Sequence, residues 1–356
     1  MMQSINFPLR ESAHLHRAEI REQKNGGFGR SGRREMSQLL RSLKNPVAQM
    51  IVALSCGRPR LRRCFGRAGI TPARFGNRLV PVPLQNGLGS LLFAGAGDVH
   101  LSFQLVWTGI DYYEPFTRTV IEMLGSLNEV FIDVGANIGF FSMVAGKVNP
   151  RLQVVAFEPN PKMFALLCEH KRANGLSNLT ANSLAVSNRD GIGQLLLNSS
   201  DMSASLESDF QRHLNPMVDS VSVETTTLDS YVQRHGISGP LLLKIDAEGH
   251  EKAILEGARF TISQFRPDVV IEVLGEFEPA VLEQFRKAGY RFYRISHEGL
   301  IESEHVTLNR IGDFVFFNYL FTTKTPGLLR DISDTIRKRA RHINLYRTSK
   351  YVGKPV

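Results

Sequence analysis

The chain has 356 residues, a hydrophobic fraction of 42% and a formal net charge of +9. This length is typical of about two to three domains, and the apolar content is enough for a sizeable core. The three cysteines, Cys56, Cys64 and Cys168, lack the spacing of a zinc site or a disulfide scaffold, so we expect a cytoplasmic protein. No run of about 18 apolar residues occurs, so we expect no transmembrane helix.

The positive charge is concentrated at the two ends. Residues 1–78 carry 16 basic and 4 acidic side chains, and residues 324–356 carry 9 and 2. The middle, residues 79–323, carries 18 basic and 28 acidic side chains and is therefore acidic. A protein that reads nucleic acid usually concentrates basic charge on its folded face, so we do not expect nucleic acid as a partner.

Composition divides the chain into four predicted segments. A basic tail without fixed structure covers 1–35, and an N-terminal extension with a helix and then a small β unit covers 36–104. The main domain is predicted at 105–322, and a basic C-terminal helix and tail at 323–356. We expect that helix to dock on the main domain, because its apolar stripe is narrow. Weak contact of its basic side chains with a membrane surface is the alternative.

The most informative segment is 130–141, which reads VFIDVGANIGFF. It predicts a buried strand, a tight glycine turn and the first turn of a helix, as in α/β proteins that hold a nucleoside cofactor at the end of a parallel strand. A second apolar strand follows at 153–158 and ends in Glu158. A carboxylate at that place can accept the hydrogens of both ribose hydroxyls.

The glycine spacing argues against a dinucleotide. The pattern is Asp133, Gly135 and Gly139, and Asn137 stands where a second glycine would let the backbone approach a pyrophosphate. Asp133 is also unsuited to a diphosphate, but suits a ligand with an amino group, such as the methionine part of S-adenosylmethionine. Gly135 would let the backbone turn beside that part, and Gly139 would let the helix pack closely on the strand.

A third strand end is rich in polar side chains. Residues 241–251 read LLLKIDAEGHE, in which five of the six positions after the apolar strand are polar or glycine. Alternation along a strand places Lys244 and Asp246 on one face. A buried lysine needs a partner, so we expect an ion pair with Asp246 or Glu272. Glu272 is itself an acid inside the apolar stretch 269–274.

Strands alternate with helices through most of the main domain. Predicted strands at 130–134, 153–158, 241–246 and 268–274 are mostly apolar, without the regular polar alternation of a half-exposed strand, and helical patterns lie between them. This arrangement predicts an α/β fold with a mostly parallel sheet and helices on both faces. Late strands near 290–295 and 313–319 suit an antiparallel edge.

Several ordered motifs together resemble the FkbM family of S-adenosylmethionine-dependent methyltransferases. The resemblance covers roughly residues 105–320, and its pieces are Tyr113-Glu114-Pro115, the segment 131–142, Phe157-Glu158-Pro159-Asn160, Ala185-Val186, Thr227-Leu228-Asp229, the segment 244–251 and Leu255-Glu256-Gly257-Ala258. It implies the Rossmann-like class I methyltransferase fold with seven strands. It also implies S-adenosyl-L-methionine as cofactor, held by Asp133, Gly135, Ala136, Asn137, Gly139, Phe140, Glu158, Pro159, Asn160 and Ala185.

Members of the family typically O-methylate sugars or natural products, so a small-molecule hydroxyl is the expected acceptor. A hydroxyl is a poor nucleophile at neutral pH, and a general base is expected. Asp246 is the first candidate, Glu248 the second and His250 the third, with Lys244 orienting Asp246 or holding the substrate. His250 stands where the family often has a small residue. A metal held by Asp246, Glu248 and Glu272 is a less favoured alternative, and no metal is assigned.

Three rival functions follow from the same residues. An NAD-dependent oxidoreductase would need room for a pyrophosphate. A nucleic-acid methyltransferase would use the basic ends of the chain, but the sequence has no Asn-Pro-Pro-Tyr-type motif for amino methylation. A non-catalytic scaffold that binds S-adenosylmethionine would be expected to lose Asp133 or Glu158, and both are present. No motif identifies the acceptor or the oligomeric state.

Overall fold

The structure is a computed structural model. It describes residues 79–84, 88–94, 99–198, 204–206, 217–274, 277, 279–307, 309–311, 314–316 and 318–343. The predicted unstructured tail 1–35 and the predicted helix near 36–56 lie outside these residues, as does the chain after residue 343. The division into four segments therefore stays a prediction.

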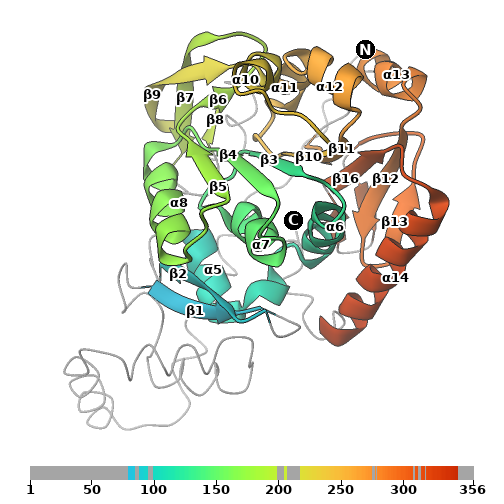
Figure 1. Ribbon diagram of the computed structural model, residues 1–356, viewed down its shortest axis with the longest axis horizontal. Coiled ribbons are helices and arrows are strands. Elements are labelled where there is room, and N and C mark those ends of the chain that lie inside the picture. The colour runs from blue at the N-terminus through green and yellow to red at the C-terminus, as the bar shows by residue number, and fades with distance from the viewer. Residues whose placement is uncertain are drawn as a thin grey trace, which may run out of the picture.

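A single large sheet forms the centre of the molecule, in the strand order β13-β12-β16-β11-β10-β3-β4-β5 (Figure 1). Its strands are β3 (Val130–Val134), β4 (Gln153–Phe157), β5 (Leu179–Asn182), β10 (Leu241–Ile245), β11 (Asp268–Glu272), β12 (Arg291–Ser296), β13 (Gly299–Glu302) and β16 (Asn318–Thr322). The five strands β3, β4, β5, β10 and β11 run parallel, and β16 is antiparallel to both β11 and β12. The predicted seven strands are present, and β13 adds an eighth by forming a hairpin with β12.

Helices cover both faces of this sheet, as predicted (Figure 1). One face packs on α6 (Pro115–Gly125), α7 (Phe140–Val148), α8 (Pro161–Ala173) and α14 (Pro326–Ile343). The other packs on α10 (Leu228–Arg234), α11 (Glu251–Glu256), α12 (Arg259–Phe265) and α13 (Pro279–Lys287). Within β10, Leu242 belongs to the first core and Leu243 to the second, because successive side chains of a strand point to opposite faces.

One predicted helix is divided in two. The pattern of residues 251–259 predicts a single helix, but α11 ends at Glu256 and α12 begins at Arg259. Gly257 between them lies so close to Ser187 that a β-carbon there would overlap the backbone oxygen of Ser187. The chain therefore bends where α11 approaches the neighbouring loop.

The N-terminal extension contributes a hairpin of β1 (Leu79–Pro83) and β2 (Ser90–Ala94), followed by α5 (His100–Thr108) and a short 3-10 turn at Ile110–Tyr112. Two side chains of α8 hold the hairpin. His170 accepts from the Ala94 N–H at 2.9 Å and contacts the Ile138 carbonyl at 3.0 Å. Asn174 bonds both backbone groups of Leu92. The extension is therefore tied to α8, which contacts the glycine turn at Ile138.

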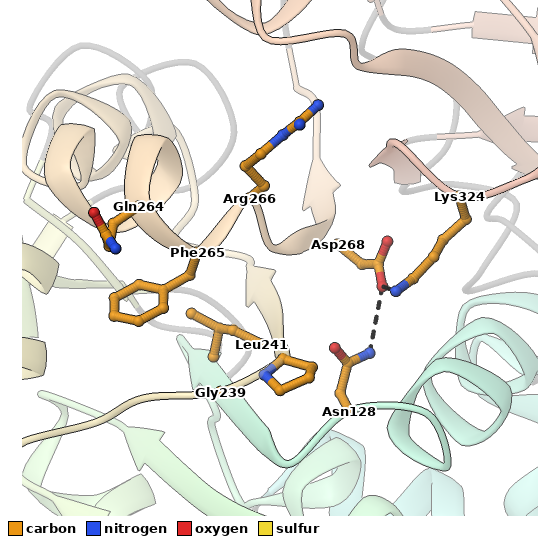
Figure 2. Close-up of a pocket in the computed structure, with 9 residues that line it drawn as sticks. Asn128, Gly239, Leu241, Gln264, Phe265, Arg266, Asp268 and Lys324 are labelled. Carbon is orange, nitrogen blue, oxygen red and sulfur yellow. Dashed lines mark hydrogen bonds and ion pairs between the residues drawn. The ribbon is translucent and has the colours of Figure 1, made fainter.

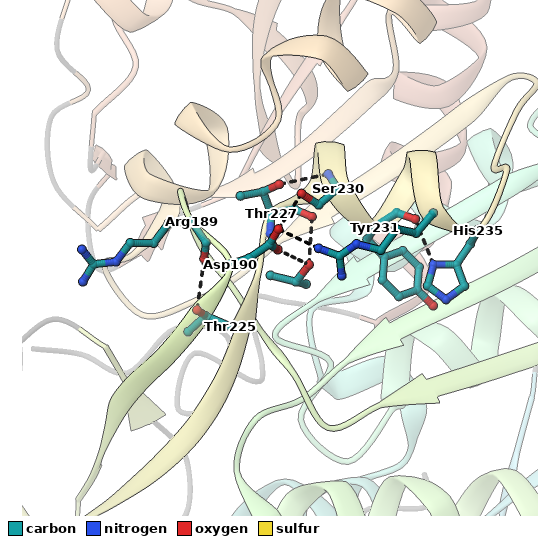
Figure 3. A network of polar contacts seen from close by, with 9 residues as sticks. Arg189, Asp190, Thr225, Thr227, Ser230, Tyr231 and His235 are labelled. Carbon is teal, nitrogen blue, oxygen red and sulfur yellow. Dashed lines mark hydrogen bonds and ion pairs between the residues drawn. The ribbon is translucent and has the colours of Figure 1, made fainter.

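A second, smaller sheet has the order β6-β9-β7-β8 and sits beside the β5 end of the molecule (Figure 1). Its strands are β6 (Ala185–Val186), β7 (Gly191–Asn198), β8 (Ala204–Ser205) and β9 (Met217–Thr226). Asp190 joins it to α10 by accepting from Thr226, Ser230 and Arg234 (Figure 3). Burial raises the pKa of Asp190, but the hydrogen bonds together outweigh it and hold that pKa at about 2. The network is exposed and its role is structural.

The C-terminal helix α14 docks on the main domain. Its apolar side chains Leu329, Ile332 and Ile336 are buried in the core on the α6 side of the sheet. This confirms the docked helix. Among the described residues, none of the helices is both long and apolar enough to cross a bilayer.

Candidate functional site

The predicted site residues meet at one edge of the large sheet. The strands β11, β10, β3 and β4 are neighbours and run parallel, so their carboxyl ends lie side by side. Asp133 lies within β3 near its end, Glu158 directly follows β4, Asp246 directly follows β10, and Glu272 ends β11. We call this edge the carboxyl edge. Ligands of open α/β sheets bind at such an edge.

Glu158 is held by the turn that precedes α7. Its two carboxylate oxygens accept backbone N–H groups of Asn137 at 2.7 Å and of Asn160 at 2.8 Å. Burial raises its pKa to about 7, although these two bonds oppose the shift. A carboxylate offers about four acceptor positions, so two stay available here. That capacity fits the two hydroxyls of a ribose.

Asp133 is completely buried on the inner side of the site. Its Oδ2 accepts from the Ser142 hydroxyl at 2.6 Å, and its neighbour in register on β10 is Lys244. Its Oδ1 has no hydrogen-bond partner among the described residues. Burial raises the pKa of Asp133, against the effect of Lys244. A buried acceptor without a donor fits a ligand that carries an ammonium group.

The glycine turn brings two strand ends together. Gly135 has φ +78°, and a β-carbon there would overlap the backbone oxygen of Asp246. Gly139 has φ +84° and precedes α7, packing against Met143 and Leu167. The structure therefore requires glycine at 135 for the approach of the turn to β10. Its predicted place beside the methionine part of a cofactor stays a prediction.

Lys244 and Asp246 form the predicted ion pair. The distance from Lys244 Nζ to Asp246 Oδ2 is 2.8 Å, and the lysine side chain is 2% exposed. Its ammonium group also lies 4.8 Å from the centre of the Phe141 ring. Burial opposes ionisation of Asp246, but Lys244 outweighs it and lowers the pKa of that carboxyl. Asp246 is therefore an ionised carboxylate with a fixed orientation.

Two further acids stand beside Asp246. One carboxylate oxygen from each of Asp246, Glu248 and Glu272 lies within 4.8 Å of the others. Burial, and then the charge of Asp246, raises the pKa of Glu248 to about 8 and that of Glu272 well above its ordinary value. Carboxylate oxygens in such a group could hold a divalent cation. The same group can also accept hydroxyl hydrogens.

Sequence reasoning missed three residues of this site. Burial raises the pKa values of Tyr113 and Glu114, and the charge of nearby Asp246 adds to this shift. Asn318 is the register partner of Glu272. Asn318, the first residue of β16, donates to Glu114 at 3.0 Å. The Tyr113 ring packs edge-on against Phe140 at 5.2 Å. The motif Tyr113-Glu114-Pro115 was a signal for the first two, whereas Asn318 belongs to no motif.

The other predicted contact residues lie in the core or in the loops. His250 is buried, with its Nε2 2.9 Å from the Ser187 hydroxyl, so it links the loop after β10 to the end of β6. Phe140 lies in a cluster of aromatic rings. Ala185 packs against Leu195 and Val223 of the smaller sheet. Ala136, Pro159 and Asn160 lie in the two loops that flank Glu158. Their contacts with a cofactor stay predictions.

A cavity of about 310 Å³ lies at the opposite edge of the sheet, where β10 and β11 begin (Figure 2). Asp268 is buried there, accepting from Asn128 at 3.3 Å and lying 3.5 Å from Lys324 Nζ. Leu241, Phe265 and Arg266 form part of the wall. The cavity contains none of the predicted site residues, so it is separate from the carboxyl edge.

Comparison with known proteins matches the main domain to a family. The model of the methyltransferase FkbM domain matches residues 133–292. The hexuronic acid methyltransferase AglP of Haloferax volcanii is 26% identical over 189 residues, 53% of this chain and 70% of that protein. The 31-O-demethyl-FK506 methyltransferase FkbM of Streptomyces tacrolimicus is 28% identical over 202 residues, 49% of this chain and 74% of that protein. The 2-O-methyltransferase NoeI of Sinorhizobium fredii is 24% identical, covering 42% of this chain and 65% of that protein.

Among solved structures, a methyltransferase FkbM from Methylobacillus flagellatus KT is 14% identical, with a TM-score of 0.34. That match covers 80% of this chain and 60% of the other. The family match includes all four acids at the strand ends: Asp133, Glu158, Asp246 and Glu272. Residues 133–292 therefore match a methyltransferase FkbM domain, and the chain is an S-adenosylmethionine-dependent methyltransferase.

Proposed function

We propose that this enzyme transfers the methyl group to a hydroxyl of a sugar or of another natural product. The names of the relatives support this reaction, since they describe methyltransferases for a hexuronic acid, for a 2-O position and for 31-O-demethyl-FK506. The observation that carries the proposal is the ionised Asp246, whose carboxylate is held by Lys244. It follows β10, which lies between β3 and β11 in the sheet.

The residues of β3 and β4 would hold the cofactor. Glu158 has acceptor capacity left for both ribose hydroxyls, and Asp133 has a buried oxygen that would receive the ammonium group. The backbone of the glycine turn, with Gly135 and Gly139, would enclose the part of the cofactor between its ribose and its ammonium group. These assignments use only the strand ends next to β10.

Asp246 would serve as the general base. When bound, S-adenosylmethionine supplies a methyl group that is activated by its attachment to a sulfonium. Asp246 would accept the proton of the acceptor hydroxyl, so that this oxygen could take the methyl group and leave the sulfur as the neutral thioether of S-adenosylhomocysteine. Lys244 would keep the carboxylate oriented, and Glu248 and Glu272 would bound the acceptor side. Alignment of this kind can contribute up to about 7–11 kcal/mol at the extreme.

The proposal predicts that Asp246→Asn abolishes turnover while the fold and cofactor affinity persist. Loss of a general base typically reduces the rate by about 10²–10⁴. Labelled methyl transfer measures turnover, and calorimetry with S-adenosylhomocysteine measures affinity. Asp219→Asn, an exposed aspartate of β9, is the matched control. Full activity of Asp246→Asn would contradict the role of Asp246.

The acceptor class is tested by incubating the enzyme and a lysate with isotope-labelled S-adenosylmethionine, followed by mass spectrometry. The proposal predicts labelled O-methyl groups on small hydroxylated molecules. Label confined to nucleic acid would favour the alternative reaction, and no label at all would favour a non-catalytic scaffold. The cytoplasmic location and a weak membrane contact through the basic side chains of α14 stay predictions.

A further inference from the structure

The order of the strands separates two sides of the reaction site. From one side to the other the parallel strands are β11, β10, β3 and β4. Glu158 and Asp133 belong to β4 and β3, whereas Asp246 follows β10 in the middle. With the cofactor on the β3 and β4 side, as in the proposed function on which this inference rests, the acceptor must approach Asp246 from the β11 side.

Glu272 is the acid at the end of β11 on that side. Its Oε2 is buried and has no hydrogen-bond partner among the described residues. One of its oxygens lies within 4.8 Å of oxygens of Asp246 and Glu248. A buried acceptor without a donor is costly, unless a ligand supplies the donor. A hydroxyl next to the one that reacts is such a donor.

Glu114 adds a further carboxyl group to the wall that Glu248 and Glu272 form beside Asp246. It stands directly before Pro115, where an extended backbone is usual, yet its φ is 37° and its ψ 54°. Its side chain does not cap α6. Instead it accepts from Asn318, which is the register partner of Glu272 on β16. Asn318 therefore fixes Glu114 next to Glu272.

The charge of this wall restricts what can bind. Glu114, Glu248 and Glu272 are carboxyl groups around Asp246, and Lys244 is already paired with Asp246 at 2.8 Å. Burial raises the pKa of these three glutamates, so the negative charge here is carried by Asp246. A carboxylate on the acceptor would be repelled by Asp246 and would find Lys244 already engaged among these carboxyl groups. Hydroxyls, by contrast, can donate to them without a charge penalty.

We propose that Glu272, together with Glu114 held by Asn318, binds an uncharged polyhydroxylated acceptor beside Asp246. The site thus selects a neutral sugar over the corresponding uronate. This differs from the substrate in the name of the relative from Haloferax volcanii. Glu272 accepts the hydrogen of a neighbouring hydroxyl, and Glu114 places a carboxyl group where a uronate would need a basic partner.

The test compares methyl glycosides of glucose, galactose and mannose with methyl glucuronide and methyl galacturonide, each with labelled S-adenosylmethionine. The wild type should label at least one neutral glycoside at least tenfold better than any uronate, as kcat/KM. Glu272→Leu should raise the KM for that glycoside at least tenfold, whereas Glu272→Gln, which keeps an acceptor oxygen, should restore most of the loss. Glu114→Lys, which supplies a basic partner, should reduce the preference for the neutral glycoside at least threefold.

Glu122→Gln is the control, because Glu122 lies on α6 but bonds Arg339 instead of facing the site. Thermal unfolding and the affinity for S-adenosylhomocysteine show whether each variant is folded. Preferred labelling of a uronate, an unchanged KM in Glu272→Leu, or an unchanged preference in Glu114→Lys would overturn the inference while methyl transfer stands. Failure to label any neutral glycoside also overturns it, and labelling of the lysate then reports separately on the proposed function.

Discussion

At the residue scale, the site depends on carboxyl groups whose surroundings differ. Asp246 is kept ionised by Lys244, while burial raises the pKa of Glu158 to about 7. The pair formed by Lys244 and Asp246 was predictable because an alternating strand places both side chains on one face. The bond from Asn318 to Glu114 spans 204 positions of sequence, and no local pattern indicates it. Only the folded sheet brings such residues together.

Glu158 gives a prediction for pH. A raised pKa means that its contribution to the stability of the free protein is complete below about pH 4.5 and is lost as pH rises through about 7. Ribose hydroxyls donate to the ionised carboxylate, so binding should release a proton. Affinity for S-adenosylhomocysteine should therefore be about tenfold weaker at pH 6 than at pH 8.

Calorimetry at the two pH values checks this expectation. Glu158→Gln should bind more weakly and lose the dependence on pH. If the variant kept the same dependence, a different group would be titrating, and the assignment of Glu158 to the ribose would be wrong.

At the element scale, the turn between β3 and α7 is the part that sequence predicted best. Apolar strands, the glycines at 135 and 139 and the acid after β4 all appear where their patterns indicated. The reason for Gly135 was not accessible, since it is a contact with the backbone of Asp246 on another strand. The break at Gly257 was missed for the same reason, because Ser187 comes from a distant loop.

Gly135→Ala tests the turn. A β-carbon would overlap Asp246 at a backbone that already has φ +78°, so the free energy of unfolding should fall by about 3 kcal/mol or more. Gly175→Ala is the control, because its φ is +62° but nothing lies within 4 Å of its β-carbon. It should cost only about 1 kcal/mol. Equal losses in urea unfolding would show that the contact with Asp246 is unimportant.

At the scale of the whole molecule, side-chain bonds join α14 to α6. Arg339 of α14 donates to Glu122 at 2.8 Å and to Thr119 at 2.6 Å, both on α6. That helix begins directly after Glu114. Docking of the C-terminal helix was predicted from its narrow apolar stripe. Its partner α6 was not predicted, because the spacing of apolar residues along one helix does not indicate which distant helix it contacts.

Arg339→Met should destabilise the protein by about 3 kcal/mol, since it leaves Glu122 in a partly buried place without this partner. Lys338→Met, on the exposed side of α14, should change stability by less than about 0.5 kcal/mol. Chemical denaturation compares the two. Similar small effects would mean that the ion pair does not hold α14 in place.

The most direct measurement is a crystal structure with S-adenosylhomocysteine bound. The account predicts that the ribose hydroxyls bond Glu158, that the ammonium group bonds Asp133, and that the sulfur faces Asp246 across the end of β10. A ligand bound elsewhere, or one whose ribose makes no contact with Glu158, would contradict it.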